Sequence, residues 1–125
     1  MSTFYILTLG CSKNRVDSEY AVTLLSAAGH RQVDDPQRAD WVLINTCAFI
    51  EDARVESIDT LLAFAEERYE GQKIAALGCL VQRYAGELQE ALAEVDGFVG
   101  TSAIGEIVQM MNDPTRLYRH ESPAA

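Results

Sequence analysis

The sequence predicts an α/β fold: a flavodoxin-like three-layer sandwich around a five-stranded parallel sheet. Three observations lead to this prediction. Strand-like apolar runs alternate along the chain with segments of helical periodicity, which is typical of repeated β-α units. The central apolar run is nearly continuous, as a strand buried on both faces requires. The 125 residues, 48% of them hydrophobic, suffice for one domain with a substantial core.

The first half of the chain is expected to contain three strands and two helices. The run 4–9 (FYILTL) has strand composition, and 16–28 carries apolar residues at helical spacing; a glycine follows each segment. A short edge strand is expected over 30–33. The run 41–45 (WVLIN) predicts a buried strand, and 51–69 predicts a second helix.

The second half repeats this alternation. A strand is expected over 73–77 (KIAAL), a helix over 84–92, a last strand over 97–100 (GFVG) and a last helix over 103–111. Five strands that include one early edge strand best fit the order 2-1-3-4-5. We expect one domain over residues 1–112.

The remaining residues, 113–125, are expected to be a loose tail or the start of a linker. The net charge of -9 disfavours attraction to nucleic acid or to an anionic membrane. No apolar run approaches the roughly 20 residues that cross a bilayer, and no signal peptide is recognisable, so we expect a cytoplasmic protein. Residues 85–114 hold six acidic side chains and no Lys or Arg. This segment either keeps the surface solvated or docks a basic partner.

Three cysteines, Cys11, Cys47 and Cys79, occupy equivalent places in the predicted fold. Each follows the end of a strand, so all three should lie at the carboxyl edge of the sheet, just before a helix. Ligands bind at this edge in open parallel sheets, in the crevice where the strand order reverses. Thiolates at helix N-termini are stabilised, and they select zinc, copper or iron–sulfur clusters.

The count of three cysteines suggests a metal site with one open position, because closed zinc sites and most iron–sulfur clusters take four protein ligands. A single buried cysteine is usually only a small hydrophobic residue, but three at neighbouring strand ends favour a site. His30 is the candidate for a fourth ligand, although it stands at the amino end of its strand.

Other active sites fit the sequence poorly. A phosphatase loop needs an arginine six positions after its cysteine, where this chain has Asp17, Ala53 and Ala85. The chain has no P-loop, no GxGxxG motif and only two histidines, His30 and His120.

Five polar residues are expected to surround the cysteines: Lys13, Asn14, Asn45, Thr46 and Arg83. Each also has a simpler interpretation. Asn14 could cap a helix, as could Asp17, while Asn45 and Thr46 could merely end a strand. Arg83 could form a surface salt bridge instead of lying near an anionic cluster.

Three cysteine-containing motifs carry a family resemblance: GCSKNRVDSE at 10–19, INTCAFIEDARVESI at 44–58, and GCLVQRY at 78–84 followed by EVDGFVGTS at 94–102. Together they resemble the N-terminal (UPF0004-type) domain of the radical SAM methylthiotransferases, over residues 4–102. The residues that follow the first two cysteines are similar to the ribosomal-protein (RimO-type) branch rather than the tRNA-modifying branch. Ala93 departs from the family, which often has proline there.

The resemblance implies a cofactor and a reaction. In this family the three matching cysteines, Cys11, Cys47 and Cys79, hold an auxiliary [4Fe-4S] cluster whose open iron carries sulfur. A following radical SAM domain uses S-adenosylmethionine and a second [4Fe-4S] cluster. The substrate is an aspartate of a small-subunit ribosomal protein, a basic partner that complements the negative charge of this chain.

The same resemblance sets expectations for the chain alone. It lacks a CxxxCxxC motif, so we expect it to bind one cluster but to be inactive without a further domain. We expect a monomer without direct binding to nucleic acid or membrane. The alternatives are a tRNA methylthiotransferase domain and a non-catalytic α/β module that binds zinc or a protein.

Overall fold

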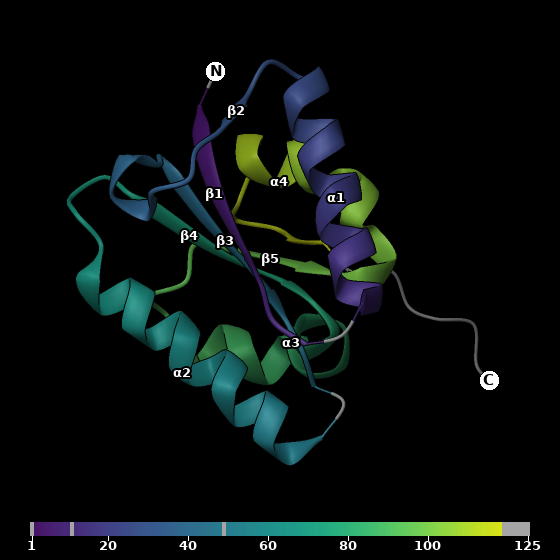
Figure 1. Cartoon of the computed structure of the whole chain (residues 1–125). Helices are drawn as coiled ribbons and strands as arrows, with labels where there is room; N and C mark the ends of the chain where they lie inside the picture. Colours follow the sequence, from purple (N-terminus) through teal and green to yellow (C-terminus); the bar gives the residue numbers. More distant parts are fainter. Residues whose placement is uncertain (1, 11, 49, 119–125) are drawn as a thin grey trace.

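The protein folds around one parallel sheet flanked by helices on both faces (Figure 1). The computed structural model describes residues 2–10, 12–48 and 50–118. Within them the sheet has six strands in the order β2-β1-β3-β4-β5-β6, all paired in parallel. The strands are β1 (Thr3–Thr8), β2 (Arg31–Gln32), β3 (Trp41–Thr46), β4 (Lys73–Gly78), β5 (Gly97–Gly100) and β6 (Leu117–Tyr118).

Four α-helices and two short 3₁₀ helices connect these strands. They are α1 (Ser12–Ala27), η1 (Pro36–Arg38), α2 (Glu51–Glu67), α3 (Cys79–Ala91), η2 (Thr101–Glu106) and α4 (Ile107–Asn112). The flavodoxin-like class and the order 2-1-3-4-5 are therefore confirmed for the first five strands.

The predicted count of five strands is wrong, because β6 adds a sixth. Leu117 and Tyr118 pair with Phe98 and Val99 of β5, inside the segment expected to be a loose tail. A two-residue strand is too short to produce a recognisable alternation. The last helix also differs from its prediction over 103–111: it begins as a 3₁₀ turn at Thr101 and becomes α-helical only at Ile107.

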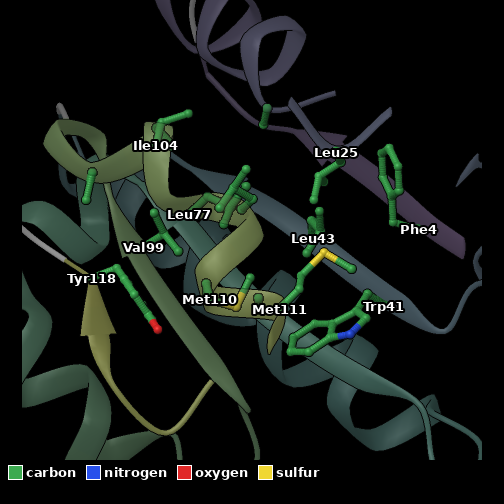
Figure 2. Close-up of a cluster of buried hydrophobic side chains, with 14 residues drawn as sticks. Phe4, Leu25, Trp41, Leu43, Leu77, Val99, Ile104, Met110, Met111 and Tyr118 are labelled. Atoms are coloured by element: carbon green, nitrogen blue, oxygen red, sulfur yellow. The ribbon is translucent and has the colours of Figure 1, made fainter. Parts of the chain in front are cut away.

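Two hydrophobic cores cover the two faces of the sheet. Figure 2 shows the first core, in which side chains of α1, η2 and α4 pack on alternate residues of the strands. It includes Leu25 of α1, Leu43 of β3 and Met110 of α4. The second core joins α2 and α3 to the opposite face, around Ile44, Leu61 and Leu80. Since every residue of β3 is buried, the end of this strand is held from both sides.

The structure also bears on the expected absence of a membrane segment. Among the described residues, none of the helices combines the length and the apolar character needed to cross a bilayer.

Candidate metal centre

Two of the three predicted ligands lie at the ends of neighbouring strands. Cys47 directly follows β3, and Cys79 directly follows β4 as the first residue of α3. The last paired residues of these strands, Thr46 and Gly78, are in register, so the two cysteines leave the sheet side by side. Cys11, the third predicted ligand, lies outside the described residues, between the end of β1 and the start of α1.

Both described cysteines line one pocket. It has a volume of about 560 Å³ and lies at the carboxyl edge of the sheet. Cys47 is buried, with 8% of its surface exposed, and Cys79 is partly exposed. The lining is largely apolar and comprises Gly10, Lys13, Asn14, Cys47, Ile50, Ala53 and Cys79. Among the described residues, no three His, Cys, Asp or Glu side chains form a metal-binding group, so the described part of the site contains two thiols.

Gly10 brings the end of β1 into direct contact with Cys47. Its φ of +93° is in the left-handed region, and a Cβ built there would lie 2.8 Å from both Cβ and Sγ of Cys47. No residue with a side chain could be placed at this distance. The segment that leads to Cys11 therefore passes directly beside the second cysteine.

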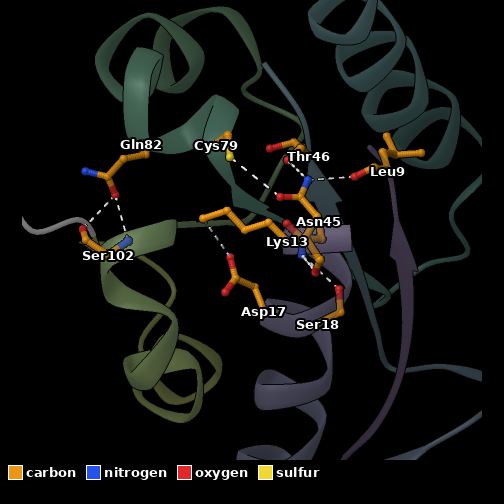
Figure 3. A network of polar contacts seen from close by, with 10 residues as sticks. Leu9, Lys13, Asp17, Ser18, Asn45, Thr46, Cys79, Gln82 and Ser102 are labelled. Atoms are coloured by element: carbon orange, nitrogen blue, oxygen red, sulfur yellow. Dashed lines mark hydrogen bonds and ion pairs between the residues drawn. The ribbon is translucent and has the colours of Figure 1, made fainter. Parts of the chain in front are cut away.

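Asn14 connects the strand ends around the pocket. Its side chain is buried, with 1% exposed. The amide nitrogen donates to the carbonyl oxygens of Leu9, at 2.7 Å, and Thr46, at 2.9 Å. The thiol of Cys79 donates to the amide oxygen, with 3.7 Å between Sγ and Oδ1 (Figure 3). A helix cap accepts a backbone N–H through its side-chain oxygen, whereas the Asn14 oxygen accepts from Cys79 and Asn14 lies inside α1, so the capping interpretation is wrong.

Asn45 extends this network under the pocket. Its amide nitrogen donates to the backbone carbonyl of Asn14, at 2.8 Å, and to the hydroxyl of Ser18, at 2.9 Å. Ser18 in turn shares a hydrogen bond of 2.7 Å with Thr8 of β1. These contacts fix the start of α1 against β1 and β3. Figure 3 shows the contact between Asn45 and Ser18.

Thr46 joins β3 to the start of α3. Its hydroxyl donates to the carbonyl of Leu77, at 2.5 Å, and accepts from the backbone N–H of Leu80, at 3.2 Å. The second contact satisfies one of the free N–H groups at the helix start. Asn45 and Thr46 therefore do more than end a strand, since they hold the elements that carry Cys47 and Cys79.

Ser57, on α2, is a site residue that the sequence analysis did not identify. Its hydroxyl accepts from the backbone N–H of Cys47, at 2.9 Å, and donates to the carbonyl of the same residue, at 3.0 Å. Ser57 is fully buried and lies one helical turn before Leu61, on the face of α2 that enters the core. A polar residue in register with core positions was the available signal.

Among the described residues one basic side chain lines the pocket, and two others follow the described cysteines along the chain. Lys13 lines it and forms an ion pair of 3.5 Å with Asp17. Arg83 donates to the carbonyl of Ala48, at 3.4 Å, so its contact is with the segment after Cys47. Arg54 lies over the ring of Tyr84, 5.4 Å from its centre. A hydrogen bond to Glu51, together with the charge of that carboxylate, raises the pKa of the Arg54 guanidinium above its ordinary value.

The candidate fourth ligand, His30, is not part of this site. Its Nδ1 accepts a hydrogen bond of 3.0 Å from the backbone N–H of Ser2. This contact lies at the amino end of β1, whereas the pocket lies at the carboxyl end.

The fold and the pocket define a class of protein: a parallel α/β domain with a pocket at the carboxyl edge of its sheet that both described cysteines line. The chain belongs to the Uncharacterized protein family UPF0004, whose model matches residues 3–100. The predicted family membership is thus confirmed.

Relatives of this chain carry a common name, "Ribosomal protein uS12 methylthiotransferase RimO". The protein from Anaeromyxobacter sp. (strain Fw109-5) is 49% identical over 87% of this chain and 24% of its own length. The one from Pelodictyon phaeoclathratiforme is 44% identical over 94% of the chain and 28% of its own length. A Campylobacter jejuni protein is 40% identical over 98% and 27%. The chain therefore spans about a quarter of the length of the relatives it matches.

Proposed function

We propose that this chain is the cluster-binding N-terminal domain of a ribosomal-protein methylthiotransferase. In this proposal Cys11, Cys47 and Cys79 hold an auxiliary [4Fe-4S] cluster. The observation that carries the proposal is the position of Cys47 and Cys79, which follow neighbouring strands and line one pocket beside Gly10. Relatives named as methylthiotransferases support the assignment of the reaction.

The residues around the pocket fit such a group. Thiolates are the ligands that iron–sulfur clusters take, and the pocket offers two thiols with a third cysteine next to Gly10 in the sequence. An apolar lining limits the access of water, which influences the redox potential of a bound cluster. Lys13 and Arg83 place positive charge near a group that carries net negative charge when three thiolates bind it.

The reaction requires more than this chain. When bound, the cluster would present an iron without a protein ligand, at which sulfur can be held for transfer. We propose that the part of the full-length protein outside this chain supplies a radical SAM domain with S-adenosylmethionine and a second [4Fe-4S] cluster, so that this chain alone is inactive. The substrate would be an aspartate of a basic small-subunit ribosomal protein, modified in the cytoplasm.

Anaerobic reconstitution tests the proposal. The 125-residue chain is incubated with iron and sulfide, and the amounts of iron and sulfide bound per chain are then measured. Electron paramagnetic resonance after reduction identifies the type of cluster. We expect about four irons and four sulfides per chain, the composition of a cubane cluster. We also expect the signal to shift when an external thiol is added, since one iron is open.

Two other results would overturn the assignment. A colourless chain that binds one zinc per molecule instead would indicate a zinc module. A full-length enzyme that modifies tRNA and leaves the ribosomal protein unmodified would place the domain in the tRNA-modifying branch.

A further inference from the structure

Asn14 reaches the chain segments of all three cysteines. We define the cysteine loops as residues 9–11, 46–48 and 78–80, of which Cys11 itself is not described. Asn14 donates to the carbonyl of Leu9 in the first loop and to that of Thr46 in the second. It accepts from the thiol of Cys79 in the third. The side chain of Asn14 therefore contacts all three loops.

The orientation of this side chain is determined by its neighbours. Both hydrogens of the Asn14 amide are used by backbone carbonyls, which can only accept. Rotating the amide by half a turn would set its oxygen against those two carbonyl oxygens and remove the amide donor from both. The amide oxygen must therefore face Cys79, where it can accept the proton of an unliganded thiol.

The surroundings leave this side chain little freedom. It is buried, and a Cβ at Gly10 would lie 3.1 Å from its nitrogen. Its own backbone carbonyl accepts from the buried Asn45. Breaking the two amide bonds would remove a donor from each of these carbonyls, which disfavours any other orientation of the side chain.

We propose that Asn14 is a positioning residue that holds the three cysteine loops in register before a metal binds. It acts through the carbonyls of Leu9 and Thr46 and through the thiol of Cys79, and it is not itself a ligand. A ligating sulfur carries no proton, so the contact with Cys79 belongs to the metal-free state, whereas the two carbonyl contacts need no thiol proton. The inference rests on the proposed function in taking the three cysteines as one ligand set.

The test uses cadmium, a soft ion that binds thiolates without needing sulfide. The reduced, metal-free chain is titrated anaerobically with Cd²⁺, and the thiolate-to-cadmium absorbance gives the affinity and the number of sulfurs bound. Asn14→Ala removes all three side-chain contacts. Asn14→Ser keeps a single hydroxyl donor and serves as a milder variant if the alanine variant does not fold.

Gln72→Ala is the matched control. Gln72 is also buried, and its amide nitrogen likewise donates to two backbone carbonyls, those of Pro36, at 2.7 Å, and Ala39, at 2.9 Å. It directly precedes β4 at the amino edge of the sheet, whereas the cysteine loops lie at the carboxyl edge. Circular dichroism and the fluorescence of Trp41 establish that each variant is folded. Trp41 is the single tryptophan of the chain and is buried in the first core.

We expect Asn14→Ala to weaken Cd²⁺ binding by about 10- to 100-fold, the usual effect of removing a residue that orients metal ligands. Asn14→Ser should fall between this variant and the parent, and Gln72→Ala should stay within about twofold of the parent. In the metal-free chain, Cys79 should be alkylated faster in Asn14→Ala than in Gln72→Ala, because its thiol loses the contact with Asn14.

Different outcomes separate the inference from the proposed function. If folded Asn14 variants bind Cd²⁺ as the parent does, or if Gln72→Ala weakens binding equally, Asn14 does not position the ligands. If the parent binds Cd²⁺ through three sulfurs and the Asn14 variants lose affinity, but reconstitution yields no iron–sulfur cluster, the inference holds and the proposed cofactor is wrong. A parent that binds Cd²⁺ through fewer than three sulfurs overturns the inference.

Discussion

Gly10 lies against Cys47 so closely that a Cβ on the glycine would be 2.8 Å from the sulfur. The left-handed backbone at Gly10 and the position of the thiol therefore depend on one another. A substitution at Gly10 must either move Cys47 or move the segment that leads to Cys11. This relationship provides a way to disturb the site without changing any cysteine.

Gly10→Ala should lower both stability and metal uptake. A residue with a side chain in the left-handed region costs on the order of 1–3 kcal/mol, and the contact with Cys47 adds to this cost. The free energy of unfolding in urea and the iron bound after reconstitution measure the two effects. Gly29→Ala is the control, since Gly29 has a φ of +96° but no heavy atom within 4 Å of a Cβ. Equal iron uptake by both variants would refute the idea that the contact matters.

Ser57→Ala should destabilise the chain by about 1–3 kcal/mol, because it leaves the buried N–H and carbonyl of Cys47 without their partner. Alkylation of Cys47 should also become faster as its loop loosens. Thr60→Ala, on the same helix, loses a hydrogen bond to Glu56 at an exposed position and should change stability far less. Urea unfolding and mass spectrometry of the alkylated cysteines measure both effects. Similar values for the two variants would argue against a role for Ser57.

Replacing any of the three cysteines by alanine should abolish stable cluster binding while the fold persists. Cys47 and Cys79 contribute one sulfur each to a pocket rather than to the centre of a core, so the loss of the thiol leaves both cores intact. Iron content after reconstitution and circular dichroism test this expectation for Cys11→Ala, Cys47→Ala and Cys79→Ala. Full iron content in all three variants would contradict the site assignment.

Tyr118 should contribute measurably to stability although it lies near the end of the described chain. Its ring is buried, and its hydroxyl donates to the carbonyls of Asp113, at 2.8 Å, and Gln109, at 3.2 Å. Tyr118→Phe should cost about 1 kcal/mol and Tyr118→Ala about 3 kcal/mol in urea unfolding. Thr115→Ala, at an exposed residue of the preceding turn, is the control. Unchanged stability in Tyr118→Ala would mean that β6 does not hold the edge of the sheet.

The parts of the fold that follow local patterns were predictable. Apolar runs such as 41–45 and 73–77 identified buried strands, and the alternation with helices gave the order of the first five strands. β6 was missed because a strand of two residues, which follows a proline-containing turn, is too short to show an alternation of apolar and polar residues. The last helix was predicted as one continuous segment, because the apolar residues of a 3₁₀ turn and of an α-helix recur at similar spacing over a few residues.

The candidate site, like the fold, was predictable only in part. The carboxyl ends of β3 and β4 follow from the strand order, so the proximity of Cys47 and Cys79 was a consequence of topology. The role of Asn14 did not follow from topology. An asparagine near a helix start can cap the helix or bond to distant strand ends, and only its hydrogen-bond partners distinguish the two roles. Ser57 was hidden for the same reason: its partner, Cys47, lies ten residues away on a different element.

The arrangement of the cysteines also has a consequence for the order of assembly. They are separated by more than 30 residues from one to the next; Cys47 and Cys79 directly follow β3 and β4, and Cys11 follows β1 in the sequence. Pairing strands over this range requires long loops to close first. A partly synthesised or unpaired chain would offer a metal only scattered thiols. Under the proposed function, cofactor insertion would therefore be a final step of maturation, and a chain that holds its cofactor would be one in which β1, β3 and β4 are already paired.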